Sequence, residues 1–134
     1  MPGAWLEDGV TSDVTFRAWA ATRDELVAAA VDATTAAMVA ELDSLRAVER
    51  RTVTVEAGAD EVIFLKDTAA LLLRAVAVRV EGAAAPWRAI ATLAGERIDP
   101  ARHHLVADVK AVTWHGLRVE RHGAEWQAEV TLDV

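Results

Sequence analysis

Two segments near opposite ends of the chain share one alternating pattern. Apolar and polar residues alternate over residues 12–20 and again over residues 125–134, which is the period of a β-strand with one buried face. Asp13 falls on the polar face of the first segment and Asp133 on the polar face of the second. Strands of this kind must cover their apolar faces, so the elements between them decide the fold class.

The segments between these strands predict two helices and further strands. Thr22 and Glu25 form a capping box, and apolar residues then recur at helical spacing to about Leu42, which predicts a helix over residues 22–42. A weaker pattern predicts a second helix over residues 59–72. Strands are predicted over residues 46–56, 76–80, 87–94, 106–113 and 117–121, the last in a hairpin with residues 125–134. The pattern favours an α+β fold with two helices and a mixed or antiparallel sheet of about six or seven strands.

Length and composition favour one domain in the cytoplasm. A chain of 134 residues can bury its own core, so we expect a single domain over residues 1–134. The absence of cysteine excludes a disulfide framework, a thiolate metal site and a cysteine nucleophile. We find neither a leader-like start nor a run of roughly 20 apolar residues. We therefore expect a cytoplasmic protein with no membrane association.

The charge of the chain limits the class of partner. The formal net charge is −7, whereas tight nonspecific binding to nucleic acid needs many Lys and Arg side chains on phosphates. We therefore expect no tight direct binding to nucleic acid. An acidic surface suits a protein partner or a cation better.

The sequence offers little for nucleophilic catalysis. Ser12 and Ser44 are the only serines, and no Gly-x-Ser-x-Gly elbow or phosphate-binding glycine loop is present. We therefore expect no enzyme, and a small hydrolase with paired carboxylates is the weakest alternative. Trp19 and Trp114 fall outside the apolar patterns, and either could anchor a partner on the surface.

The two ends of the chain could together bind a cation. If the strands that hold Asp13 and Asp133 pair, their carboxylates would lie close to the main-chain carboxylate of Val134. Three oxygen anions without sulfur suit a hard cation such as Ca²⁺ or Mg²⁺. The alternative is that Asp13 is an ordinary strand-edge residue and Asp133 a solvated chain end.

Lys110 is one of only two lysines beside twelve arginines. Its ammonium could support an acidic site or present a point charge to a phosphate. The alternative is a salt bridge to Asp108, Glu96 or Asp13, which contributes little when exposed.

The four histidines do not suggest a zinc site. His103 and His104 are adjacent, so in an extended chain they point to opposite faces, and the spacings lack a helical metal pattern. His115 precedes a glycine at the entry to the predicted hairpin, where it could hydrogen-bond to the backbone. His122 is expected at the solvated tip of that hairpin.

An ordered set of residues in the last third of the chain resembles archease, a small accessory protein of RNA ligation. A set of this kind is more specific than a single short motif. The matching residues are Gly95, Glu96, Asp99, Pro100, His103 or His104, Val109, Lys110, Ala111, Thr113, His115, Gly116, Leu117, Leu132, Asp133 and Val134.

The resemblance implies a function and a site. In the archease family the aspartate of the N-terminal motif, the penultimate aspartate and the terminal residue form a metal site, here Asp13, Asp133 and Val134, with Ca²⁺ expected and Mg²⁺ as the alternative. Lys110 and His115 match positions expected to support that site or to contact a partner. The resemblance also implies that the chain promotes guanylation and multiple turnover of an RtcB-type RNA ligase, in transfer RNA splicing or RNA repair.

Two points depart from this resemblance or compete with it. The family motif near the N-terminus carries an acid and a histidine before its Thr-Ala-Asp, whereas Gly9 and Val10 stand there in this chain. A chaperone-like modulator of the specificity or solubility of a tRNA-modifying enzyme is the alternative function that the family suggests. That role would depend on exposed apolar surface more than on a metal.

Overall fold

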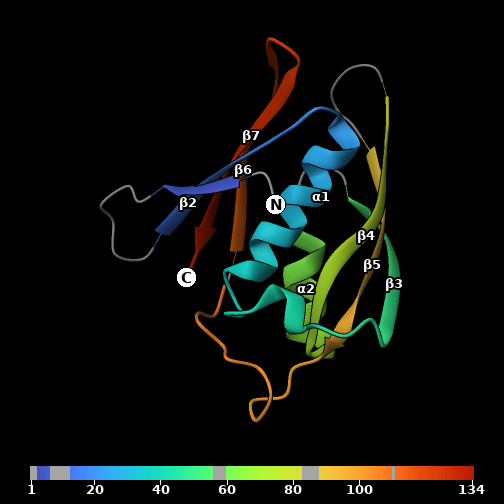
Figure 1. The fold of residues 1–134 in the computed structure, drawn as a ribbon, viewed down its shortest axis with the longest axis vertical. Helices are drawn as coiled ribbons and strands as arrows, with labels where there is room; N and C mark the ends of the chain where they lie inside the picture. The colour runs from blue at the N-terminus through green and yellow to red at the C-terminus, as the bar shows by residue number, and fades with distance from the viewer. Residues whose placement is uncertain (1–2, 7–12, 56–59, 83–87, 110) are drawn as a thin grey trace.

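The computed structural model describes residues 3–6, 13–55, 60–82, 88–109 and 111–134. Within them, two α-helices and one short 3₁₀ helix accompany strands in two antiparallel sheets (Figure 1). The elements in chain order are β1 (Gly3–Leu6), β2 (Asp13–Ala20), α1 (Arg23–Ala36), η1 (Leu42–Ser44), β3 (Glu49–Val55), α2 (Asp60–Ala69), β4 (Leu71–Glu81), β5 (Arg88–Arg97), β6 (Ala111–His122) and β7 (Glu125–Asp133). This arrangement confirms the predicted α+β class.

The strands form two sheets, whereas the sequence predicted one. One sheet has the order β1-β2-β7-β6 and the other the order β3-β5-β4. Helix α1 packs against β2 and β7 of the first sheet and against β4 of the second, and Figure 1 shows it between the two groups of strands. The two sheets are therefore joined by packing on the same helix, and no backbone hydrogen bonds between strands connect them among the described residues.

Side chains of α1 explain why the second sheet ends at β4. The Asp32 carboxylate accepts a hydrogen bond from the backbone amide of Ala75 at 2.8 Å, and Thr35 donates one to the carbonyl of Leu73 at 2.6 Å. Asp24, two turns before Asp32, accepts from the amide of Val80 at 2.8 Å. These helix side chains occupy backbone groups that a neighbouring strand would otherwise use.

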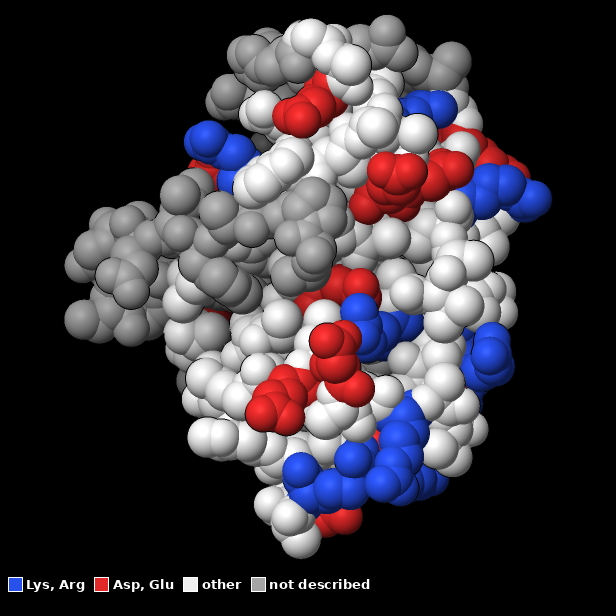
Figure 2. Space-filling model, viewed as in Figure 1, with Lys and Arg blue, Asp and Glu red and all other residues white. Residues whose placement is uncertain are grey.

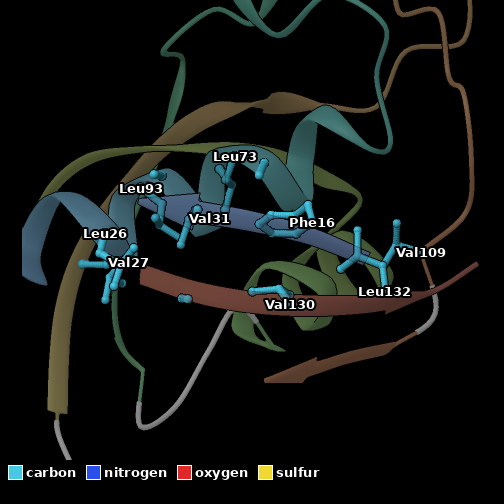
Figure 3. Packing of buried hydrophobic residues seen from close by; sticks show 14 of the residues in the cluster. Phe16, Leu26, Val27, Val31, Leu73, Leu93, Val109, Val130 and Leu132 are labelled. Atoms are coloured by element: carbon cyan, nitrogen blue, oxygen red, sulfur yellow. The ribbon is translucent and has the colours of Figure 1, made fainter. Parts of the chain in front are cut away.

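A single apolar core joins the two sheets through α1. Figure 3 shows side chains from β2, α1, β4, β5 and β7 directed into one shared space. Phe16, Val31, Leu73, Leu93 and Leu132 are all buried there. The alternation predicted for the terminal strands is confirmed, because the apolar faces of β2 and β7 both point into this core.

The first helix is shorter than predicted, while its start is as expected. Thr22 caps it by accepting a hydrogen bond from the amide of Glu25 at 3.1 Å. The helix ends at Ala36 and does not continue to Leu42. Beyond its end, the backbone of Met38 accepts a hydrogen bond from Val106 at 2.9 Å. This long-range pairing replaces the last predicted turn.

Two other boundaries also differ, and one strand contains a bulge. The second helix ends at Ala69 because Ala70 adopts a left-handed φ of 54°, so Leu72 lies in β4. The register of β4 against β5 shifts between Ala75 and Ala77, and this bulge leaves Val76 exposed. The strand predicted from residue 106 begins only at Ala111. The predicted turn at residues 82–86 lies largely outside the described residues.

Ion pairs distribute charge over the surface. Arg74 on β4 pairs with Asp43 of η1 at 2.8 Å and with Asp32 of α1 at 3.6 Å. Figure 2 shows acidic and basic side chains close together over much of one face, with Lys and Arg gathered at its lower end. No helix among the described residues is long and apolar enough to cross a membrane.

Candidate functional site

The two strands that carry Asp13 and Asp133 pair directly. In the antiparallel pair β2–β7, Asp13 is the register partner of Asp133. On the other side of β7, Ala111 of β6 is also a partner of Asp133. Residues Asp13, Asp133 and Ala111 thus form one row across the end of the four-stranded sheet, which we call the terminal row. The pairing that the cation hypothesis required is therefore present in the fold.

The two residues at the end of β7 have different environments. Leu132 is buried in the core, and Asp133 on the opposite face is exposed to solvent. Val134 is partly buried and packs against the core. The side chain of Asp133 is therefore open to solvent while the residue after it is held against the protein.

A hydrogen bond fixes the register next to the terminal row. The hydroxyl groups of Thr15 and Thr131 are 3.0 Å apart, and Thr15 is buried. They lie two residues along each strand from Asp13 and Asp133, so they belong to the same face. A slip by one residue would move every side chain to the other face of the sheet, and this pair opposes such a slip.

The other predicted site residues are placed only in part. Lys110 lies outside the described residues, although its neighbours Val109 and Ala111 are described. His115 belongs to β6, in the segment where the register against β7 shifts between Trp114 and Leu117. The side chains of β6 fall outside the described part of the chain.

The sequence hypotheses missed Lys66, the other lysine. Its ammonium donates to Asp108 at 2.5 Å and to the carbonyl of Val109 at 2.9 Å, and it pairs with Asp67 at 3.0 Å. Burial alone would lower the pKa of Lys66, but the hydrogen bonds to Asp108 and Asp67 outweigh it and raise that pKa. Asp108 was one of the acids suggested for Lys110, and in the structure it binds Lys66.

Lys66 also holds the segment that leads to the terminal row. Val109 is fully buried, and its carbonyl accepts from the Lys66 ammonium. Only one residue separates Val109 from Ala111, which lies opposite Asp133. The signal available in the sequence was the rarity of lysine, which applies to Lys66 as much as to Lys110.

A second acid named for Lys110 also has partners elsewhere in the chain. Glu96 of β5 is buried and contacts both Arg102 and Nε2 of His103. Nδ1 of His103 accepts a hydrogen bond from the amide of Asp99 at 2.9 Å, so Nε2 carries the ring proton and donates it to Glu96. Burial and the neighbouring Arg102 charge lower the pKa of His103. The imidazole is therefore neutral at neutral pH.

The two adjacent histidines have different environments. His103 is buried and His104 is exposed, which confirms that the two point in different directions. Among the described residues, no group of three or more His, Asp or Glu side chains is arranged to hold a metal ion. That finding does not cover the main-chain carboxylate of Val134 or the side chain of Asp13.

Two antiparallel sheets pack on one shared helix, and in one of them β2 pairs with the last strand of the chain, β7. This arrangement defines a class of small α+β protein. The model of the Archease protein family (MTH1598/TM1083) matches residues 5–134. The chain therefore belongs to the archease family, as its sequence resemblance predicted.

Individual relatives agree with this assignment. The chain is 30% identical to protein archease of Methanopyrus kandleri over 139 aligned positions, which cover 97% of this chain and 99% of the relative. It is 28% identical to protein archease of Pyrococcus abyssi over 76 residues, 56% of this chain and 54% of that one. The solution structure of Methanobacterium thermoautotrophicum protein 1598 has a TM-score of 0.77 at 24% identity and 98% coverage of both chains. That last likeness concerns the fold alone.

Proposed function

We propose that this chain is a noncatalytic accessory protein that activates an RtcB-type RNA ligase, and that its terminal row binds a divalent cation. The single observation that carries the proposal is the register that sets Asp13 opposite Asp133. Membership of the archease family supports an accessory role. The cation would be Ca²⁺, with Mg²⁺ as the alternative.

The chemistry of the donors fits a hard cation. Residues opposite one another in an antiparallel pair present their side chains on the same face, which supports convergence of the two aspartates. Asp133 is exposed, so water can complete the coordination shell, as it commonly does for Ca²⁺ and Mg²⁺. The main-chain carboxylate of Val134, one residue further on, would add a third anionic donor.

The residues of the chain have distinct parts in this proposal. Asp13 and Asp133 hold the cation, and the packing of Val134 against the core limits the freedom of the last carboxylate. Lys110, between the described residues Val109 and Ala111, would compensate the acids or contact the client's nucleotide. His115 would contribute on β6, either to the hairpin backbone or to the partner.

Activation would follow from presenting this acidic end to the ligase. A bound divalent cation neutralises charge that develops on transferring phosphoryl groups. The chain itself would supply no nucleophile. Its contribution is to bring pre-arranged carboxylates to the guanylation site and so to favour repeated turnover.

Calorimetric titration of the protein with Ca²⁺ and with Mg²⁺ tests the cation site. We expect Asp13→Asn and Asp133→Asn each to weaken binding by about tenfold or more, because each removes one anionic donor. Glu129→Gln is the matched control, since Glu129 lies on the same face of β7 but opposite Arg17. Equal affinity in all four proteins would remove the cation site from the proposal.

Ligation by the cognate ligase under multiple-turnover conditions tests the function. The wild-type chain should stimulate turnover and formation of the guanylated ligase, and both aspartate variants should not. Stimulation that is indifferent to the aspartates would instead favour the chaperone-like role. Turnover by the isolated chain would contradict an accessory role altogether.

A further inference from the structure

Two adjacent apolar side chains are exposed on the loop before β6. Large exposed apolar side chains of the described residues are Val48, Val76, Leu105 and Val106, with Val106 61% exposed. In the sequence, neither Val48 nor Val76 is next to another of these residues, and single exposed apolar side chains are ordinary on a protein surface. Leu105 and Val106 are neighbours and line the same pocket.

Residues of the core form the floor of this pocket. It has a volume of about 510 Å³, and the buried Met38 and Leu72 line it together with the partly buried Ile98. A space of this size accommodates more than one apolar side chain. An apolar group that entered it would cover Leu105 and Val106 and leave water.

The loop that forms the wall is held in place by backbone hydrogen bonds. The carbonyl of His104 accepts from the amide of Ala40 at 2.8 Å, and the amide of Val106 donates to Met38 at 2.9 Å. Val39 and Leu105 form an isolated antiparallel bridge between these two contacts. The exposed side chains therefore stand on an ordered backbone, which reduces the entropic cost of binding.

The lining of the pocket also includes charged side chains. Lys66, Asp67 and Asp108 line it, so one positive charge stands against two negative charges. The lysine side chain is only 8% exposed, whereas that of Asp108 is 75% exposed. The charge that an approaching partner meets is therefore predominantly negative, which favours a cation on the partner.

We propose that this pocket docks the client protein through an apolar side chain that lies next to a Lys or Arg in the client's sequence. The apolar group would fill the space beside Leu105 and Val106, and the cation would reach Asp67 and Asp108. This inference rests on the proposed function, because it assigns the pocket to the same client. Asp108 stands three residues before Ala111 of the terminal row, so one partner surface can cover both.

Binding of the cognate RtcB-type ligase to immobilised chain, measured separately from ligation, tests the docking. We expect Val106→Glu to weaken the affinity by about tenfold or more, as for a buried apolar anchor. Val76→Glu is the matched control, because it makes the same substitution at a valine that is 53% exposed on β4. Asp67→Lys should also weaken binding, and the effect should shrink at high salt.

Ca²⁺ affinity and thermal stability of each variant separate the two proposals. Docking is supported if Val106→Glu loses ligase binding while its Ca²⁺ affinity and melting temperature stay those of the wild type. Docking is overturned if Val106→Glu and Val76→Glu bind the ligase equally well, even when Asp133→Asn does not. Ligase binding that depends on Val106 without any stimulation of turnover would contradict the proposed function and leave the docking pocket standing. A ligase that does not bind the wild-type chain would contradict both.

Discussion

The hydroxyl groups of Thr15 and Thr131 are hydrogen-bonded across β2 and β7, two residues from the pair Asp13 and Asp133. The bond joins the two inner strands of the four-stranded sheet, and Thr15 is buried there. Because it lies on the same face as the terminal row, it links the stability of the strand pairing to the geometry of the proposed cation site.

We expect Thr15→Val to destabilise the protein by about 0.5–1.5 kcal/mol, because it removes this hydrogen bond and leaves the Thr131 hydroxyl without that partner. Urea denaturation measures the change. The double variant Thr15→Val with Thr131→Val should lose less than the sum of the two single changes, because the second change removes an already unpaired group. Strictly additive losses would mean that the two hydroxyls do not interact.

Gly95 on β5 should tolerate no side chain. A Cβ at this position would lie 1.8 Å from the carbonyl oxygen of Leu72 and 2.8 Å from its carbonyl carbon, both backbone atoms. Gly95→Ala must displace β4 from β5, and we expect a loss of about 3 kcal/mol or more in the free energy of unfolding. Gly123→Asn is the comparison in the same urea experiment. Gly123 has a φ of 70° with nothing within 4 Å, and Asn accepts that conformation readily, so its loss should be small.

Lys66→Met should destabilise the protein by about 1–3 kcal/mol, because the buried carbonyl of Val109 and the Asp108 carboxylate lose a charged donor. Asp67→Asn serves as its control, since an exposed partner contributes little. The pKa of Lys66 is raised above 10.5 in the folded protein, so its contribution is complete at neutral pH. It should disappear only as the pH rises through that raised value. Denaturation at pH 7 and at high pH measures both effects.

His103 should make the folded protein sensitive to mild acid. Glu96, Arg102 and Asp99 surround the ring, and burial with the Arg102 charge lowers the pKa of His103 below 6.5. Just below that pH the unfolded chain binds a proton that the folded chain does not, so stability falls as the pH falls.

The variant His103→Gln should therefore lose less stability than the wild type between neutral pH and about pH 5, although it starts lower. Unfolding free energies across that range provide the measurement. His104→Gln alters the exposed neighbour and should retain the wild-type pH profile. A wild-type profile in His103→Gln would mean that other groups control the acid response.

The terminal strands could be predicted because their side chains alternate strictly. The alternate apolar residues Phe16, Ala18 and Ala20 of β2 and Ala128, Val130 and Leu132 of β7 belong to the same core, so the period of the sequence matches that of the structure. The register between the strands came instead from the archease resemblance and from the requirement that the two aspartates meet. The backbone pairing of Asp13 with Asp133 agrees with that requirement.

Other features could not be predicted because they depend on distant parts of the chain. The bulge that exposes Val76 has no local signal, since Val76, Val78 and Val80 alternate as in a regular strand. Ala70 ends α2 in a left-handed conformation that alanine seldom adopts. Lys66 meets Asp108 forty-two positions away, a contact that no local sequence pattern indicates.

The side chains of Asp24, Asp32 and Thr35 have a consequence for the behaviour of the chain at high concentration. They form hydrogen bonds with backbone groups on the outer side of β4, the side on which another strand would have to pair. A foreign strand that approached this side would have to displace α1 and expose the core before it could pair. The first helix thus acts as a barrier against fibril growth from β4, a property that requires no charged residue on the strand itself.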